Sequence, residues 1–285
     1  MPEFDRCVPG SGRRWKVMKG TMSNSNRFRA LVFSAVFAAL PTFGQLADFN
    51  STGVRMGHIH LVVKDPDAHK QFYTLLGGVP LKNGPLELIQ FPGGMVMLRK
   101  GEPSGGTAGS RVNHWGFWVK DIADTLDKIQ GLGYPTERRN PKQAFVLTPD
   151  DVRIELLEDS GLTVPIRLHH VHLEAPDPAA VQAWYGKIFG AVPGKRERFD
   201  NVTLPGVELS ITKTDTPETP TKGRSFDHVG FDVKAIDEFS KRLEAEGLKF
   251  DAPIRQVPGA KTRVAFFTDP WGLYVEVTEN LAPGS

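Results

Sequence analysis

The feature that most constrains this chain is an eight-residue pattern that occurs four times and always opens on histidine. It stands as "HIHLVVKD" at 58–65, "HWGFWVKD" at 114–121, "HVHLEAPD" at 170–177 and "HVGFDVKA" at 228–235. The opening histidines are spaced by 56, 56 and 58 residues. Similarity at a nearly fixed period indicates repeated supersecondary units, each of which needs neighbours to bury its apolar face.

The segments between the octets also follow a common order. Helix-like stretches occupy 65–78, 121–134, 177–191 and 235–250; an aspartate stands at the start of three, and glycine occurs near the end of all four. Aspartate is a good N-cap and glycine a good C-cap. Short alternating runs with Pro, Gly or Asp turns come next and predict strands. Each unit is therefore predicted to be a strand, a helix and then two or three strands.

The four units are of two kinds. The first and third share His-x-His-Leu, whereas the second and fourth share His-x-Gly-Phe, as if a pair of modules had been duplicated. We expect a linker at 45–56 and a tail at 281–285. The first module pair is predicted at 57–160, with modules 57–100 and 111–160, and the second at 161–280, with modules 167–213 and 224–280. This similarity favours pairing of contiguous modules, but pairing of the first with the fourth would give the same ligand types.

Residues 1–44 are predicted to be a signal peptide and leader. Arg27 and Arg29 precede "ALVFSAVFAAL" at 30–40, an apolar run of signal-peptide length that is too short to span a bilayer. Small residues at 42 and 44 suit cleavage after Gly44, although a buried helix of the domain is an alternative. The only cysteine, Cys7, lies in this segment. We therefore expect an exported protein, periplasmic or extracellular, whose mature chain has no disulfide.

The charge distribution bears on partners. Net charge is +2, yet seven Lys and Arg residues and only two acids lie in 1–44, so the remainder is mildly acidic. A mildly acidic body without a basic run argues against a nucleic-acid partner. We expect a small-molecule partner and, after signal cleavage, no membrane contact.

Metal chemistry is suggested by the residues themselves. Alternate residues of a strand share a face, so His58 and His60 point one way and Ile59 the other. Closing strands add Glu155 and Glu276, each six residues after a turn proline. The same count from Pro92 places Leu98 there in the first module, and a count from Gly206, in a segment one residue shorter, places Ser210 there in the third.

These positions predict two ligand sets, which follow from contiguous pairing. The sets are His58, His114 and Glu155, and His170, His228 and Glu276. Each leaves open coordination positions, which suits Fe(II) first and also Mn(II), Ni(II), Co(II) or Zn(II). We expect the second set to be the better site, because Ser210, or Glu208 after a register slip, could add an oxygen whereas Leu98 could not.

The second histidines, His60 and His172, need another role. Two residues along a strand span about 6.6 Å on the same face. The second histidine is then too far away to duplicate the metal bond of the first, yet close enough to reach a substrate held on the metal. These second histidines are predicted to act in acid–base catalysis or substrate binding, with Gly116 and Gly230 of the even modules leaving room opposite. The alternative is that they hydrogen-bond Glu155 or Glu276 and orient these carboxylates.

The pattern resembles the vicinal oxygen chelate superfamily, which includes glyoxalase I, bleomycin and fosfomycin resistance proteins and extradiol dioxygenases. The resemblance covers 57–279 and is carried by the histidine seven residues before aspartate, by "FY" on the first helix and by "DPWGLYVE" near the end. It implies an α+β fold of four βαβββ modules that form two curved-sheet pairs, each enclosing a metal. The four-module length is similar to that of extradiol dioxygenases.

The resemblance leaves the reaction open. The further histidine and tyrosine that extradiol dioxygenases carry before the last turn are not matched, since "RQVPGAKTRVAFFTDPWG" has no histidine and Phe266 stands at the tyrosine position. We expect a metal-dependent lyase, isomerase or dioxygenase acting on a small oxygen-rich substrate. The alternative is a non-catalytic small-molecule-binding protein of the bleomycin-resistance type.

Overall fold

The computed structural model describes residues 46–216 and 218–282, so the predicted leader and the last residues of the predicted tail lie outside the described residues. Each module begins with a long strand and continues with one helix, which confirms the α+β fold of four βαβββ modules. The described part of the chain contains no helix with the length and hydropathy needed to cross a bilayer.

The four modules have the following elements. Module 1 comprises β1 Val54–Val63, α1 Pro66–Leu75, β2 Val79–Asn83, β3 Leu86–Phe91 and β4 Gly94–Lys100. Module 2 comprises β5 Val112–Val119, α2 Ile122–Gln130, β6 Thr136–Asn140, β7 Gln143–Leu147 and β8 Arg153–Glu158. Module 3 comprises β9 Ile166–Ala175, α3 Pro178–Phe189, β10 Val192–Arg196, β11 Phe199–Leu204 and β12 Val207–Lys213. Module 4 comprises β13 Phe226–Val233, α4 Ile236–Ala245, β14 Arg255–Gln256, β15 Arg263–Thr268 and β16 Tyr274–Glu279.

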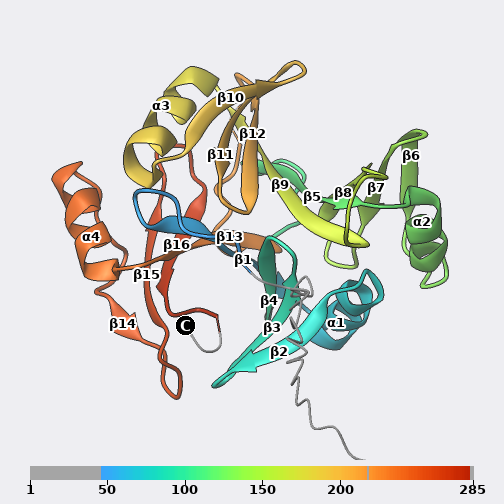
Figure 1. The fold of residues 1–285 in the computed structure, drawn as a ribbon, viewed down its shortest axis with the longest axis horizontal. Coiled ribbons are helices and arrows are strands. Elements are labelled where there is room, and N and C mark those ends of the chain that lie inside the picture. Colours follow the sequence, from blue (N-terminus) through green and yellow to red (C-terminus); the bar gives the residue numbers. More distant parts are fainter. Residues whose placement is uncertain (1–45, 217, 283–285) are drawn as a thin grey trace, which may run out of the picture. The chain divides into compact units, whose positions relative to one another are not determined.

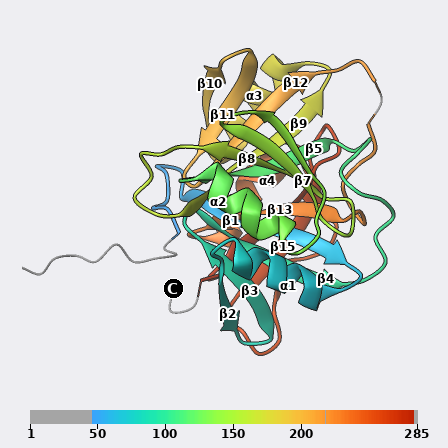
Figure 2. The ribbon, with the colours of Figure 1, turned by 90° about the vertical axis from the view of Figure 1, so that its right-hand side faces the viewer.

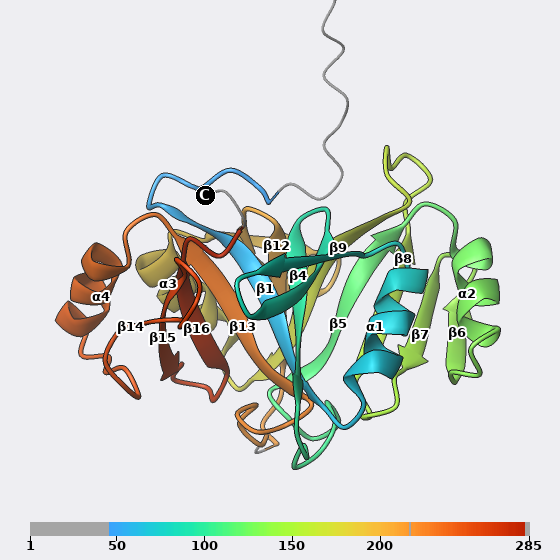
Figure 3. The same cartoon turned by 90° about the horizontal axis from the view of Figure 1, so that it is seen from below.

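The strands form two eight-stranded sheets, each built from two modules that are paired differently from the expectation (Figure 1). Sheet 1 has the order β14-β15-β16-β13-β1-β4-β3-β2 and joins modules 1 and 4. Sheet 2 has the order β10-β11-β12-β9-β5-β8-β7-β6 and joins modules 2 and 3. The prediction that contiguous modules share a sheet is therefore wrong, and the swapped arrangement is the one observed. In Figure 3 the antiparallel strands β1 and β13 run side by side across the middle of sheet 1.

Contiguous modules meet through helices and turns instead. His69 on α1 places Nε2 2.9 Å from Oδ2 of Asp150, in the turn between β7 and β8. In the second half, the Tyr185 hydroxyl on α3 donates to Oδ2 of Asp269, in the turn between β15 and β16, at 2.8 Å. Figure 2 shows α1 near α2, where the rings of Phe72 and Tyr134 are 5.0 Å apart. Helix packing within a contiguous pair thus leaves the long strands to pair with the other half.

The helix boundaries follow the predicted caps. Asp65, Asp121 and Asp177 each accept backbone N–H hydrogen bonds at the start of α1, α2 and α3, whereas Ala235 gives α4 no side-chain cap. Helix α3 ends at Gly190, which has φ of 65°, a left-handed conformation that costs glycine little. Local sequence therefore determines where the helices begin.

Strand alternation separates the core from the site. Ile59 and Leu61 on β1 and Trp115 and Phe117 on β5 are fully buried in one continuous apolar core. Their strand neighbours His58, His60 and His114 point to the opposite face because successive side chains alternate. Each long strand therefore presents an apolar face to the core and a histidine face to the inner surface of its sheet.

Two candidate metal centres

The sheet-1 centre consists of His58, His60, His228 and Glu276. Strands β1 and β13 carry the histidines, and β16 adds the glutamate beside β13. Oε2 of Glu276 lies 3.0 Å from Nε2 of His58 and 2.8 Å from Nε2 of His228. One potential ligand atom from each of the four residues lies within 4.8 Å of all the others.

The sheet-2 centre consists of His114, His170, His172 and Glu155. Ligand atoms of the three histidines again lie within 4.8 Å of one another. Oε2 of Glu155 lies 3.0 Å from Nε2 of His170 and 3.4 Å from Nε2 of His114. The structure therefore brings all six predicted ligands into clusters.

The predicted grouping of the six ligands is wrong. His58 lies with His228 and Glu276, and His170 lies with His114 and Glu155. The reason is the swapped sheet pairing, which places each odd module's first strand beside the even module of the other half.

The glycines of the even modules lie opposite the first histidine of each odd module, not the second, and leave room for its ring. Gly230 pairs with His58 and Gly116 with His170, whereas His60 pairs with His228 and His172 with His114. A Cβ on Gly230 would lie 2.1 Å from Cε1 of His58. The expectation that these glycines face His60 and His172 is therefore corrected: a side chain there would displace a predicted ligand.

Several buried ring nitrogens at these centres make no hydrogen bond within the described residues. They are Nδ1 and Nε2 of His58 and His60, and Nε2 of His114 and His170. An unpaired buried polar atom costs stability, so such atoms call for an explanation. Two imidazoles and one carboxylate with free positions form a donor set that fits a divalent cation such as Fe(II), Mn(II), Ni(II), Co(II) or Zn(II).

Neighbouring residues that the motif analysis missed set the histidine tautomers. Nδ1 of His228 lies 2.6 Å from Oδ1 of Asp227, and Nδ1 of His114 lies 2.8 Å from Oδ1 of Asn113. Because these oxygens accept, Nδ1 carries a proton in both rings and Nε2 faces the centre, where it could bind a metal. The signal in the sequence is the polar residue directly before each of these histidines.

His170 is held by another histidine, His169, which the motif analysis also missed. The two Nδ1 atoms are 2.9 Å apart, and the His169 ring stands 4.4 Å from that of Trp118. Burial, followed by the charge of His170, lowers the pKa of His169 to about 2, so this ring is neutral and can accept the His170 proton. In module 1 the corresponding position is Gly57, so His58 has no such neighbour.

The carboxylates are held in their charged form. Burial alone would raise the pKa of Glu155, but the close imidazoles of His114 and His170 outweigh it and lower that pKa far below its usual range. The pKa of Glu276 is likewise lowered, because the attraction of His58 and His228 outweighs burial. Gln143 also donates to Oε1 of Glu155. Both glutamates are therefore anionic at ordinary pH, the form in which a carboxylate can bind a metal.

The two histidine environments differ. Burial opposes the charged form of His228, yet hydrogen bonds to Asp227 and Glu276 outweigh it and raise the pKa of His228. Burial lowers the pKa of His114 to about 4 despite its interaction with Glu155. The difference follows from a carboxylate partner in one centre and an amide partner in the other.

The position equivalent to the glutamates in the odd modules is corrected by one residue in module 1. His60 pairs with Met97, and His172 pairs with Ser210, so Met97 and not Leu98 faces the sheet-1 centre. The turn at Pro92 and Gly93 is shorter than the turns that contain Pro149 and Pro270, so the equivalent position lies five residues after Pro92 and not six.

Glu208 does not occupy the fourth position of the sheet-2 centre. It accepts from Ser210 Oγ at 2.6 Å and from Arg196 Nε at 2.9 Å. Ser210 remains at the predicted position, so the register slip considered for Glu208 is not observed.

The second histidines do not bond the carboxylates. Nε2 of His172 lies 2.7 Å from Oγ1 of Thr212, and no hydrogen bond joins His60 to Glu276 or His172 to Glu155 in residues 46–216 and 218–282. The alternative in which these histidines orient the glutamates is therefore not supported. Burial, then the charges of His114 and His170, lowers the pKa of His172 to about 2, so the ring is neutral.

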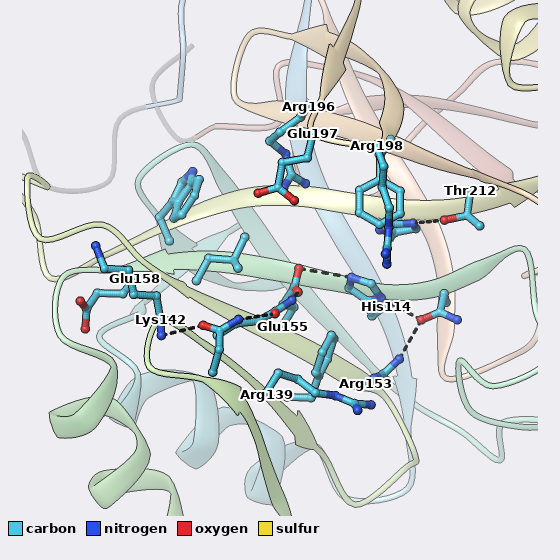
Figure 4. A pocket seen from close by; sticks show the side chains of 18 of the residues that line it. His114, Arg139, Lys142, Arg153, Glu155, Glu158, Arg196, Glu197, Arg198 and Thr212 are labelled. Carbon is cyan, nitrogen blue, oxygen red and sulfur yellow. Dashed lines mark hydrogen bonds and ion pairs between the residues drawn. The ribbon is translucent and has the colours of Figure 1, made fainter.

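A cavity of about 970 Å³ opens beside the sheet-2 centre (Figure 4). His114, Glu155 and His172 contribute to its wall, together with basic side chains from two hairpins and strand β8. The corresponding face of sheet 1 is apolar: Met95, Met97 and Leu88 pack there with Leu46 and Leu281. Leu281, expected to be part of a tail, is thus fully buried.

Comparisons with known proteins agree with this architecture. The sequence profile of the Glyoxalase/Bleomycin resistance protein/Dioxygenase superfamily matches residues 55–156 and 167–277. Glyoxalase I from Zea mays is 19% identical, with a TM-score of 0.65 over 80% of this chain and 92% of that chain. A Bacillus subtilis protein provisionally described as a dioxygenase is 14% identical, with a TM-score of 0.60 over 81% and 86% of the two chains. No curated protein sequence matches.

The chain therefore belongs to the Glyoxalase/Bleomycin resistance protein/Dioxygenase superfamily, as its sequence pattern indicated. Members of this superfamily include metal-dependent enzymes that act on small molecules. The structural likenesses are below 25% identity and establish the fold alone.

Proposed function

We propose that this superfamily member is a metal-dependent enzyme that converts a small oxygen-rich substrate at its sheet-2 centre. The observation that carries the proposal is the cavity of about 970 Å³ that shares His114, Glu155 and His172 with that centre. A concave site with converging polar groups and strongly shifted pKa values is the usual form of an active site.

The residues divide into ligands and reacting groups. His114, His170 and Glu155 would hold a divalent cation, which when bound supplies Lewis acidity toward substrate oxygens. His172 is neutral, and its Nε2 is engaged by Thr212, so Nδ1 is the atom that exchanges a proton with substrate. Asn113, His169 and Gln143 keep the ligands oriented.

The test is turnover by metal-loaded protein. The protein is loaded in turn with Fe(II), Mn(II), Co(II), Ni(II) or Zn(II), and product is measured from dicarbonyl adducts without O2 and from catechols with O2. We expect product with at least one metal, and loss of product in His114→Ala but not in Lys195→Ala, an exposed change outside the cavity. Metal-loaded protein that binds these compounds without converting them would replace the enzyme by the binding protein of the bleomycin-resistance type.

We also propose that the protein is exported. Arg27 and Arg29 before the apolar run at 30–40 support a signal peptide, with cleavage after Gly44. N-terminal sequencing of protein recovered from fractionated native cells tests this. Recovery of chains starting near Gln45 outside the cytosol is expected, and intact chains confined to the cytosol would refute export.

A further inference from the structure

We infer that the sheet-2 cavity selects substrates that carry an anionic group, a carboxylate or a phosphate, in addition to the oxygens held at the centre. This inference rests on the proposed function, because it concerns the substrate class of the same site. Two arginines support the inference, one from each module of sheet 2. Each lies against a phenylalanine ring that in turn contacts a histidine of the centre.

The first arginine belongs to module 2. Cζ of Arg153 lies 3.7 Å from the centroid of the Phe145 ring, and Phe145 meets the ring of His114 edge to face at 5.2 Å. Nη1 of Arg153 also donates to Oδ1 of Asn113 at 2.9 Å. The guanidinium is therefore fixed beside His114 and keeps donors that these contacts do not use.

The second arginine repeats this arrangement from module 3. Cζ of Arg198 lies 4.8 Å from the Phe199 ring centroid, and Phe199 meets the ring of His172 edge to face at 4.8 Å. Arg198 stands in the turn between β10 and β11, on the other side of the cavity from Arg153. In Figure 4 the side chains of Arg198 and Arg153 approach His114 from opposite walls.

The charges on the cavity wall leave cations without partners. Arg139 pairs with Glu137, and Arg196 pairs with Glu208. In contrast, Lys142, Arg153 and Arg198 form no ion pair with any of the described residues.

Most acids on the wall are already engaged. Glu155 is held by His114 and His170, Glu158 accepts from the Ile122 N–H at the start of α2, and Glu174 accepts from Asn113. Glu197 is the one remaining wall acid without a hydrogen bond or ion pair to a described residue. A bound divalent cation would add to this positive field, so an anion is the complementary occupant.

Only one half of the cationic wall is particular to sheet 2. Sheet 1 keeps a counterpart of the other half, because Cζ of Arg255 lies 6.0 Å from the centroid of the Phe266 ring, which meets the His228 ring edge to face at 5.5 Å. By strand register, Pro85 and Leu86 in the hairpin of module 1 correspond to Arg198 and Phe199 in module 3. The sheet-1 face therefore lacks one of the two arginine–phenylalanine pairs, and apolar side chains cover that half. The pair of Arg198 and Phe199 is thus not a consequence of the shared module fold.

The chemistry of the arginines identifies the ligand class. A guanidinium offers a planar fork of N–H donors that matches carboxylate and phosphate oxygens two at a time. The Phe145 and Phe199 rings restrict the positions open to the two guanidinium groups, and less conformational freedom is then lost on binding. A neutral ligand of the same shape would leave these donors unpaired.

The test compares two ligands of similar shape, one with an anionic carboxylate and one with a neutral amide. Zn(II)-loaded protein, with metal content measured first, is titrated calorimetrically with 3,4-dihydroxybenzoate and with 3,4-dihydroxybenzamide, which share the same oxygen pair. We expect the carboxylate to bind about tenfold or more tightly, since a charge-assisted hydrogen bond contributes at least that factor. Arg198→Ala should remove most of this preference while changing the affinity for the amide about twofold or less.

The control is Lys195→Ala on the same hairpin, where Lys195 pairs with Asp200 outside the cavity wall. Competition with acetate and with inorganic phosphate distinguishes a carboxylate site from a phosphate site, and displacement by either supports an anion site. Displacement by neither, equal affinity for the two ligands, or binding of neither would overturn the inference. Absence of turnover would refute the proposed enzyme but leave a measured preference for the anion intact.

Discussion

His58 on β1 lies directly across the strand pair from Gly230 on β13, and its ring fills the space where a Gly230 side chain would be. The same relationship joins His170 and Gly116 in sheet 2, where a Cβ would lie 2.6 Å from Cε1 of His170. Glycine in the second and fourth octets is therefore a packing requirement of the predicted ligand in the partner strand.

Gly230→Ala should empty the sheet-1 centre selectively. The added Cβ would displace the His58 ring, and overpacking of this kind costs about 1–3 kcal/mol. We expect the metal bound per chain to fall by the amount that the sheet-1 centre holds. Elemental analysis after equilibration with Zn(II) measures this. Gly186→Ala on α3, where the nearest atom is 3.4 Å from the new Cβ, is the matched control. Unchanged metal content in Gly230→Ala would show that His58 does not bind metal.

The swapped sheets make a prediction about which ligands act together. His58→Ala and His228→Ala should each remove the same metal ion, so the double variant should lose no more than either single one. His58→Ala combined with His114→Ala should instead lose metal from both centres, because these residues lie in different sheets. Metal content of the three single and two double variants measures this. A shared ion for His58 and His114 would mean that contiguous modules pair in solution.

The sequence is sufficient for the local features and insufficient for the pairing. Asp65, Asp121 and Asp177 cap helices because capping depends on neighbours three residues away. Strand alternation likewise predicts that Ile59 and Leu61 are buried opposite His58 and His60. Module pairing depends on which first strand pairs with the first strand of which other module. The first strands of the four modules have similar sequences, so the sequence does not select the partner.

The errors within the site have equally specific causes. The count of six from Pro92 reaches Leu98 instead of Met97 because the turn at Pro92 is shorter than that at Pro149. His169 was not identified because its neighbour His170 already matched the motif, although the two rings share a hydrogen bond. The arginine–phenylalanine pairs combine residues that are adjacent in module 3 but come from two strands in module 2. Such contacts are set by tertiary structure.

His172→Gln should separate catalysis from metal binding. The glutamine amide can still hydrogen-bond Thr212, but it cannot exchange a proton near neutral pH. We expect turnover to fall about 100-fold or more while metal content stays the same. Assays and elemental analysis on the same preparation give both quantities. If the variant loses metal as completely as His170→Ala, then His172 is itself a ligand.

The buried turn carboxylate Asp269 should make folding stability pH-dependent. Burial raises the pKa of Asp269 to about 6, even though Tyr185 and backbone N–H groups donate to it. The folded protein therefore retains this proton at pH values where the unfolded chain, with its pKa near 3.8, has lost it. The stability contributed by the proton is fully present below pH 3.8 and is lost as the pH rises to about 6, a change of about 3 kcal/mol.

Asp269→Asn tests this, because the amide keeps an oxygen acceptor for the hydrogen bonds and has no proton to lose. The free energy of unfolding of the variant minus that of the unmodified protein should rise by about 2 kcal/mol between pH 4.5 and pH 7. Urea unfolding of metal-free protein at the two pH values measures it. Asp67→Asn on the exposed side of α1 serves as the control and should leave the difference between the two pH values unchanged. A parallel pH profile for Asp269→Asn and the unmodified protein would mean that Asp269 stays ionised in the folded state across this range.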